Sequence, residues 1–178
     1  RSLPLGSTIG DFGLQVDGYA PPPGTNAKGD WQIVTYGYLE TMGEHIVRGR
    51  GIERTDTPDS QLIGLINEQM ARRYWGGRDP IGGRFRIGMN PSRPWVTVVG
   101  IVKAVHHNGL TDVVKEKFYI PHTQWARSLG NTNLIRGMTV VARTDGNPAA
   151  LTAPIREAIR QLDPALPMAD VRTMTDVV

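Results

Sequence analysis

The chain has no cysteine among its 178 residues, which excludes disulfide bonds and thiolate ligands for a metal. Cysteine-free proteins occur on both sides of a bacterial inner membrane, so this absence leaves the compartment open. Long apolar runs are also lacking. The longest, from Trp95 to Val105, is about half as long as a transmembrane helix and includes Lys103. The sequence therefore predicts no membrane span within these residues.

Serines and histidines lack the spacing of catalytic or metal-binding residues. None of the serines lies in a G-x-S-x-G motif, which argues against a serine hydrolase. His106 and His107 are adjacent in an expected strand, where neighbouring side chains point to opposite faces, and His45 and His122 are isolated. We therefore expect no catalytic residue, no cofactor-binding residue and no metal site, and hence no enzyme.

The segment from Ile66 to Gly88 carries the clearest local structure of the chain. Asn67 is a good N-cap, because its side-chain oxygen can accept a backbone N–H of the first helical turn. A helix is therefore predicted over Glu68–Trp75. Glu68 and Arg72 stand four residues apart, in the favourable orientation for an ion pair on the helix surface.

A glycine-rich turn and a short strand follow this helix. Asp79 and Pro80 predict the turn, and Arg84–Ile87 the strand. A phosphate-binding loop would precede a helix and contain G-K-[ST], whereas these glycines follow the helix and no such motif is present. We interpret the segment as a structural scaffold.

The arginines of this segment are candidates for a partner surface: Arg72, Arg73, Arg78, Arg84 and Arg86. The net charge of the chain is only +3, and acidic residues are interspersed with the basic ones. A mixed solvated face is the plainer interpretation, and binding of an anion or an anionic membrane surface is the alternative. No nucleic acid is expected as a partner, because the tryptophans are too irregularly spaced to form a base-stacking platform.

The remaining sequence mixes short strands with a few helices, which predicts an α+β fold. Residues 95–106 are apolar at both alternating sets of positions, so this strand should be covered on both faces. Asn147-Pro148 opens a helix in which Pro154 predicts a kink or a late start. The predicted strands are 12–16, 31–34, 45–48, 62–66, 84–87, 95–106, 115–120, 138–143 and 169–172, and the predicted helices are 36–42, 68–75 and 147–162, with a further helical turn beginning at Thr173.

Five ordered segments resemble one known family. They are VTYGYLETMGEHIVRGRGI, LINEQMARRYWGGRDPIGGRFRIG, WVTVVGIVKAVHHNGL, YIPH, and the stretch from Met138 to Val178. In this order and spacing the chain is similar to the periplasmic core domain of MacB-like and FtsX-like ABC transporter permeases. The residues of the pattern that we single out as structural are Gly43, Arg48, Gly49, Arg50, Asn67, Glu68, Trp75, Asp79, Pro80 and Gly82.

The resemblance implies a two-lobed α+β domain. One porter-like α/β lobe would be built from both chain ends, residues 1–52 and 134–178. An inserted, strand-rich lobe of the kind called the sabre would comprise residues 53–133. The polar stretch Glu53–Ser60 and the loose stretch Thr123–Asn133 would then be the joints. The family's domain begins further upstream, so part of the porter-like lobe would be missing at the N-terminus.

The resemblance also implies a function without catalysis. The domain would stand on the periplasmic face of the bacterial inner membrane, tethered by the transmembrane helices of its permease. It would relay ATP-driven movement of these helices to an extracytoplasmic partner or cargo. Its partners would be those helices, the ABC ATPase, and a periplasmic adaptor or lipoprotein. The alternative function is a free-standing small-molecule-binding or sensory domain.

Overall fold

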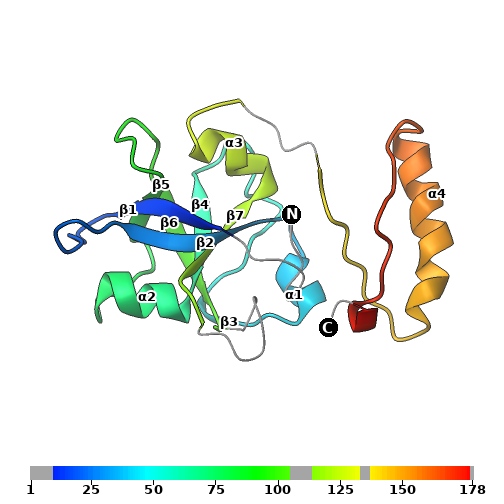
Figure 1. Cartoon of the computed structure of the whole chain (residues 1–178), viewed down its shortest axis with the longest axis horizontal. Coiled ribbons are helices and arrows are strands. Elements are labelled where there is room, and N and C mark those ends of the chain that lie inside the picture. The colour runs from blue at the N-terminus through cyan, green and yellow to red at the C-terminus, as the bar shows by residue number, and fades with distance from the viewer. Residues whose placement is uncertain (1–9, 105–113, 133–136, 177–178) are drawn as a thin grey trace. The chain divides into compact units, whose positions relative to one another are not determined.

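The computed structural model describes residues 10–104, 114–132 and 137–176, and it falls into two compact units, Arg1–Thr139 and Val140–Val178. The first unit is built on a seven-stranded mixed sheet (Figure 1). Its strands are β1 (Asp11–Val16), β2 (Ala27–Val34), β3 (Ile46–Gly49), β4 (Ile63–Asn67), β5 (Arg84–Ile87), β6 (Val96–Val102) and β7 (Lys117–Pro121). The expected α+β class is confirmed.

Strand pairing closes six of these strands into a ring. The order is β3-β6-β4-β7-β2-β1-β5, and β5 pairs back onto β6 through Arg84↔Thr97 and Phe85↔Val96. β3 stands outside the ring, antiparallel to β6. β2 and β7 are parallel, although one lies near the start of the unit and the other near its end. The ring therefore depends on pairings between distant parts of the sequence.

Helices cover both sides of the sheet. In Figure 1, α2 (Glu68–Trp75) lies below the strands, and α3 (Trp125–Ser128), preceded by η1 (His122–Gln124), lies above them. α2 buries Met70, Tyr74 and Trp75 in the larger core. α1 (Tyr38–Met42) contributes Leu39 to a second, smaller core.

Neighbouring residues of the central strands serve these two cores in alternation. On β4, Ile66 belongs to the larger core and Leu65 to the smaller one, and on β7 the same holds for Phe118 and Tyr119. All four side chains are fully buried. The prediction that the strand within 95–106 is covered on both faces is confirmed, because β6 contributes to both cores.

The segment from Ile66 to Gly88 folds as its sequence predicts, apart from one ion pair. α2 and β5 have the expected bounds, and the Asn67 side chain caps α2 by accepting the amide of Met70 at 2.9 Å. The expected pair between Glu68 and Arg72 is wrong. Glu68 instead accepts the amide of Ala104 at 3.0 Å, and Arg72 donates to Gln69 at 3.0 Å, because the loop after β6 offers Glu68 a backbone donor.

The second unit contains η2 (Pro148–Leu151), α4 (Thr152–Leu162) and η3 (Met174–Asp176). The late start predicted from Pro154 is confirmed. This proline is the third residue of α4, and the first turn does not use its amide in helical hydrogen bonds. No residue of α4 is buried.

The strands predicted at 138–143 and 169–172 are wrong. The described residues there form no strand, and Met138, Val140 and Val171 are half or more exposed. A strand exists by pairing with a neighbour, and these two segments pair with no described part of the chain. Apolar, β-branched sequence alone was therefore insufficient evidence for them.

The division into lobes at 52/53 and 133/134 stays a prediction. Within this chain the sheet joins β1 to β3, from the first range, with β4 to β7, from the second. Among the described residues, no helix is both long enough and apolar enough to cross a membrane.

Candidate functional site

Several of the residues singled out as structural in the family pattern lie around the end of β3. Arg48 forms an ion pair with Asp79, 2.6 Å between Nη2 and Oδ2. Asp79 also accepts the amide of Ile81 at 2.9 Å, which shapes the predicted Asp79-Pro80 turn. β3 is thereby tied to the turn that precedes β5. Both ionic side chains are half exposed, so the pair positions the turn more than it stabilises the fold.

Two glycines allow the backbone to pass closely at this corner. Gly49 has a φ of 77°, and a Cβ there would overlap the carbonyl oxygen of Val99. A Cβ on Gly100, its partner across the β3–β6 pairing, would overlap the carbonyl oxygen of Arg50. Any larger residue at either position would push β3 away from β6.

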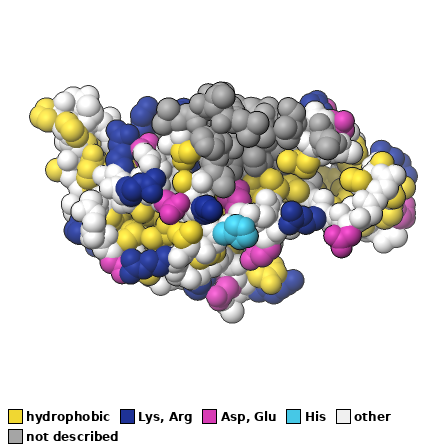
Figure 2. Space-filling view, turned by 90° about the horizontal axis from the view of Figure 1, so that it is seen from below, with side chains coloured by type: hydrophobic (Ala, Val, Ile, Leu, Met, Phe, Trp, Pro, Cys, Tyr) yellow, Lys and Arg dark blue, Asp and Glu magenta, His cyan; other side chains and the backbone are white. Residues whose placement is uncertain are grey.

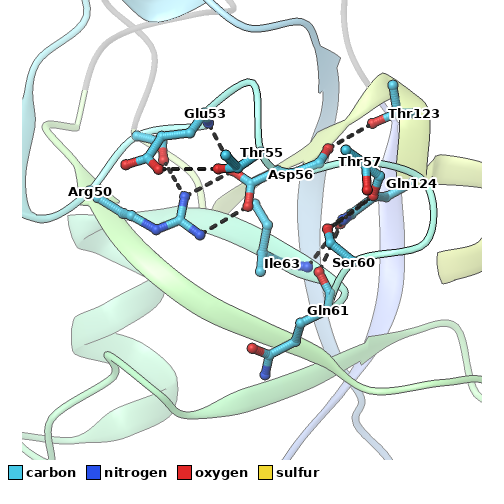
Figure 3. Close-up of polar contacts among 11 residues, drawn as sticks. Arg50, Glu53, Thr55, Asp56, Thr57, Ser60, Gln61, Ile63, Thr123 and Gln124 are labelled. Atoms are coloured by element: carbon cyan, nitrogen blue, oxygen red, sulfur yellow. Dashed lines mark hydrogen bonds and ion pairs between the residues drawn. The ribbon is translucent and has the colours of Figure 1, made fainter.

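Arg50, which follows Gly49, holds the loop that connects β3 with β4 (Figure 3). Its guanidinium makes two hydrogen bonds to the carboxylate of Asp56, at 2.8 and 2.9 Å, and the amide of Glu53 donates to the same carboxylate at 2.8 Å. Burial acts to raise the pKa of Asp56, but the bonds from Arg50 and Glu53 outweigh it and hold this pKa below its usual value. The carboxylate thus stays charged inside the loop.

Gln124, at the end of η1, fixes the second half of the same loop (Figure 3). It is fully buried, and its side-chain oxygen accepts the amide of Ile63 at 2.9 Å. Its side-chain nitrogen lies 3.0 Å from the Thr57 carbonyl, the Ser60 hydroxyl and the Gln61 carbonyl. One glutamine therefore satisfies polar groups that the loop would otherwise bury without a partner.

Further bonds come from the residues beside Gln124. Thr123 donates to the carbonyl of Asp56 at 3.2 Å, and Arg127 donates to the carbonyls of Pro58 and Ser60. The stretch 53–60, whose polarity suggested a joint between lobes, is thus attached at many points to η1 and α3. Neither Gln124 nor Asp56 was singled out from the sequence, because an isolated Gln or Asp in a polar segment carries no signal of its partners.

Asn67 and Trp75 anchor the two ends of α2. Besides capping the helix, Asn67 accepts the amide of Lys117 at 3.1 Å and donates to the carbonyl of Lys115 at 2.7 Å, which joins α2 to β7. Trp75 is buried, and its indole lies so close to Gly83 that a Cβ there would collide with it. Gly43, as predicted, ends α1 in a left-handed conformation with a φ of 71°.

The turn after α2 is closed by backbone hydrogen bonds. The amide of Gly82 donates to Val98 at 2.8 Å, and that of Gly83 donates to Pro80 at 2.9 Å. Gly82 has a φ of 80°, which favours glycine. The pattern residues described so far thus act as scaffold: they close turns, cap helices and join strands.

The five candidate arginines are bound within the chain to different degrees. Arg73 pairs with Glu116 at 3.0 Å, and Arg84 pairs with Asp17 at 2.6 Å. Arg78 donates to the carbonyl of Gly18 at 3.1 Å.

The other two arginines differ from each other. Arg86 lies 3.9 Å above the ring of Trp95 and donates to the carbonyl of Pro91. Arg72 is exposed and reaches only Gln69 on its own helix. Figure 2 shows Lys and Arg side chains interspersed with Asp and Glu on the face in view, with no continuous basic field. A partner surface at these arginines stays a prediction.

A group of charged residues is buried on the side of the sheet that α1 covers. Asp30 of β2, Glu44 after α1 and Lys117 of β7 are each less than a tenth exposed, and we call them the buried charge group. The hydroxyl of Tyr119 donates to Glu44 at 2.7 Å. Burial lowers the pKa of Lys117 to about 8, against the opposing effects of Glu44 and Asp30. This group could not be predicted from the sequence, since Asp30 and Lys117 look like ordinary surface charges of strands.

No three His, Asp or Glu side chains of the described residues lie close enough together to hold a metal ion. His45 and His122 belong to this described part, whereas His106 and His107 lie outside it.

Comparison with known protein families finds one family that matches most of the chain. The family described as the MacB-like periplasmic core domain matches residues 8–158. The chain belongs to this MacB-like family. The resemblance seen in the five sequence segments is therefore confirmed. No curated protein sequence matches the chain.

The chain is similar to solved structures of two transporter proteins. The periplasmic region of MacB from Actinobacillus actinomycetemcomitans aligns with a TM-score of 0.60 at 15% identity, over 86% of this chain and 63% of that one. The extracellular domain of the noncanonic ABC-type transporter YknZ from Gram-positive bacteria aligns with a TM-score of 0.42 at 18% identity, over 62% of this chain and 53% of that one. The first likeness shows a shared fold. This chain spans less than two thirds of either structure.

Proposed function

We propose that this chain is the extracytoplasmic part of a MacB-like ABC transporter permease, and that it relays ATP-driven movement of the transmembrane helices to a partner or cargo outside the membrane. The observation that carries the proposal is the family match over residues 8–158. In this role the chain binds no cofactor and catalyses no reaction. ATP is hydrolysed by a separate ATPase domain or subunit.

A relay needs a stiff body, because a soft one would absorb the displacement of the helices. The first unit has the features of such a body. Its strands close on themselves, and the long loop between β3 and β4 is attached through Arg50, Asp56 and Gln124. These contacts support the relay, in which the unit moves as a whole.

The proposed partners follow from the same role. The transmembrane helices of the parent permease and its ATPase drive the movement, and a periplasmic adaptor or lipoprotein receives it. Exposed Arg72 is the best placed of the candidate arginines to contact such a protein, because its guanidinium is the least committed within the chain. Residues 1–52 with 134–178, and 53–133, remain the proposed lobes, and the relay requires no movement between β1–β3 and β4–β7, which one sheet joins.

Distance measurements between paired labels test the relay in the full-length permease with its ATPase. The chain has no cysteine, so pairs of cysteines introduced at exposed Val47 and Leu162, or at Val47 and exposed Met89, can be labelled specifically within it. Electron-spin distance distributions are recorded without nucleotide, with ATP, and in a vanadate-trapped state. We expect the Val47–Leu162 distribution, which joins the two units, to change with nucleotide, and the Val47–Met89 control within the first unit to stay constant.

Two outcomes would contradict the relay. Identical Val47–Leu162 distributions in every nucleotide state, with ATP hydrolysis intact, would show that ATP does not move the first unit relative to the second. A change that follows an added small molecule but not ATP would favour a ligand-binding domain. A hydrolysis-deficient ATPase is the control, because it should bind ATP and fail to cycle.

A further inference from the structure

We propose that the outer face of the β5–β6 hairpin, formed by Arg84, Arg86 and Trp95, is a docking surface for an acidic segment of a protein partner. We call it the arginine–tryptophan face. Its two guanidiniums bind carboxylates of that segment, and its apolar atoms contact a neighbouring apolar residue. The inference rests on the proposed function, in which a partner outside the membrane receives the movement, and it specifies the chemistry of that partner. The face adds to the single exposed charge of Arg72 on α2.

The alternation of β5 places its two arginines on the outside of the sheet. Phe85 and Ile87 are fully buried in the larger core, so Arg84 and Arg86, at the alternate positions, lie on the opposite face. Trp95 comes directly before β6 and is partly exposed. The guanidinium carbon of Arg86 lies 3.9 Å from the centroid of the Trp95 ring, and that of Arg84 lies 5.4 Å from it. One indole therefore gathers two cations on the outer face.

Each guanidinium is held in place and keeps a donor for a further acceptor. Arg84 binds one carboxylate oxygen of Asp17 through Nε and Nη2, at 3.1 and 2.6 Å. Arg86 donates to the carbonyl of Pro91 through Nη1. Within the part of the chain that the structure describes, Nη1 of Arg84 and Nη2 of Arg86 have no hydrogen-bond partner. Because side chains that are already held lose little conformational entropy on binding, these donors favour the capture of an anion.

The face carries more positive than negative charge. Its carboxylate is that of Asp17, which pairs with Arg84. Exposed Arg78 approaches the same corner, because it donates to the carbonyl of Gly18, the residue after Asp17, at 3.1 Å. With Arg86, three arginines thus gather near one aspartate. An acidic partner complements this surface, and a basic one is repelled by it.

Residue type favours a protein partner over an anionic membrane surface. Residues 29–102 contain no lysine, so every cation of the hairpin is an arginine. A membrane surface attracts lysine and arginine alike, because it acts on their charge. The planar fork of a guanidinium matches a carboxylate, and Arg, Trp and Met are enriched at protein interfaces, where Lys is depleted. Met89, at the tip of the hairpin, is half exposed. The face therefore fits a protein segment that carries carboxylates beside apolar residues.

Fluorescence anisotropy with the whole 178-residue chain at low ionic strength tests the inference. The probe is a labelled peptide of alternating glutamate and leucine, and the matched peptide has glutamine in place of each glutamate. We expect the acidic peptide to bind at least about fivefold more tightly than the glutamine peptide. The double variant Arg84→Gln/Arg86→Gln should lose this preference, because it keeps the apolar part of the face and removes both charges.

Two further variants separate recognition from a structural role. Asp17→Asn frees Arg84 from its internal carboxylate and should tighten binding of the acidic peptide by about twofold or more. This gain should disappear when Arg84→Gln is present. Arg54→Gln is the matched control, because Arg54 also lies over an aromatic ring, 4.6 Å from the centroid of Tyr36. It should bind the peptide as the wild type does.

Several results would overturn the inference. Equal affinity of the acidic peptide for the wild type and the double variant would place the peptide elsewhere on the chain. Equal affinity of the two peptides, or no binding of the acidic one, would show that the face does not recognise carboxylates. Binding to vesicles of phosphatidylglycerol and phosphatidylcholine without binding of the acidic peptide would assign the face to a membrane surface.

A second measurement keeps the inference testable if the double variant does not fold. We expect the Nε resonances of Arg84 and Arg86 in the wild-type chain to shift when the acidic peptide is added. Shifts confined to other arginines would refute the assignment. The relay is tested separately, since distances that change with nucleotide in a chain that binds no acidic peptide would refute this inference alone.

Discussion

Tyr74 makes two hydrogen bonds to the backbone of a single residue, Lys28. Its hydroxyl donates to the Lys28 carbonyl at 2.6 Å and accepts the Lys28 amide at 2.9 Å. α2 is thereby joined to the start of β2, across the junction where the chain leaves its proline-rich turn. The Tyr74 hydroxyl thus pairs with both backbone polar groups of Lys28, as a neighbouring strand would. Removal of the hydroxyl leaves these two groups without that partner.

Tyr74→Phe should lower the free energy of unfolding by about 1–3 kcal/mol, because both Lys28 groups lose their partner in a partly buried position. Urea denaturation followed by tryptophan fluorescence measures the change. Tyr36→Phe is the control, since Tyr36 is 53% exposed, and it should change stability by less than about 0.5 kcal/mol. Equal effects of the two substitutions would contradict the role given to Tyr74.

Gln124→Leu should be among the most destabilising single substitutions in the chain, at about 2–4 kcal/mol. It keeps the approximate volume of the side chain but leaves the amide of Ile63 and the carbonyls of Thr57 and Gln61 without their partner. Thermal and urea unfolding provide the measurement. Gln61→Leu alters an exposed side chain and serves as the matched control. A loss below about 1 kcal/mol for Gln124→Leu would show that water replaces these bonds.

Asp56→Asn should reduce the dependence of stability on acid. The pKa of Asp56 is below its usual value, so its charged form stabilises the fold at a pH above the unfolded pKa of about 3.9. This contribution is lost as the pH falls through the lower, folded pKa. Unfolding free energies from pH 7 to pH 3 should fall less steeply in Asp56→Asn than in the wild type. Asp79→Asn, at a half-exposed ion pair, is the matched carboxylate substitution and should change the stability at pH 7 by less than about 1 kcal/mol.

Gly100→Ala should destabilise the first unit by about 1–3 kcal/mol, because the added methyl group overlaps the carbonyl oxygen of Arg50. Gly51→Ala is the control, since a Cβ there meets nothing within 4 Å and its φ lies outside the left-handed region. Denaturation curves of both variants decide the matter. If Gly100→Ala had the same free energy of unfolding as the wild type, the close approach of β3 and β6 would contribute nothing to stability, contrary to the prediction.

Local signals in the sequence predicted the local structure well. The cap at Asn67 and the alternating pattern of Arg84–Ile87 gave α2 and β5 their observed bounds. These features depend on neighbouring residues alone, so a sequence displays them directly. The strand order is different, because the pairing of β2 with β7 depends on residues that are far apart in the chain.

The polar part of the structure was the least predictable. Gln124 bonds a loop more than sixty residues earlier, and no spacing in the sequence indicates this. The contacts of the arginines at 84 and 86 with Asp17 and Trp95 of the same chain could not be predicted from the sequence either. The segments 138–143 and 169–172 have strand-like composition and no strand to pair with. The composition of a segment indicates which secondary structure it favours. The segments with which it pairs and packs determine which secondary structure it forms.

The parallel pairing of β2 with β7 also constrains the order of events when the protein is made. Residues from Asp30 to Val34 find their parallel partners in β7 only after Lys117 to Pro121 have been synthesised. Until then the N-terminal hairpin has one of its two sides open, and its apolar residues lack most of their core. Contacts between such distant segments form late and slowly. The nascent chain therefore passes through a stage in which this strand is unprotected, and a holding chaperone would have its greatest effect on yield during that stage.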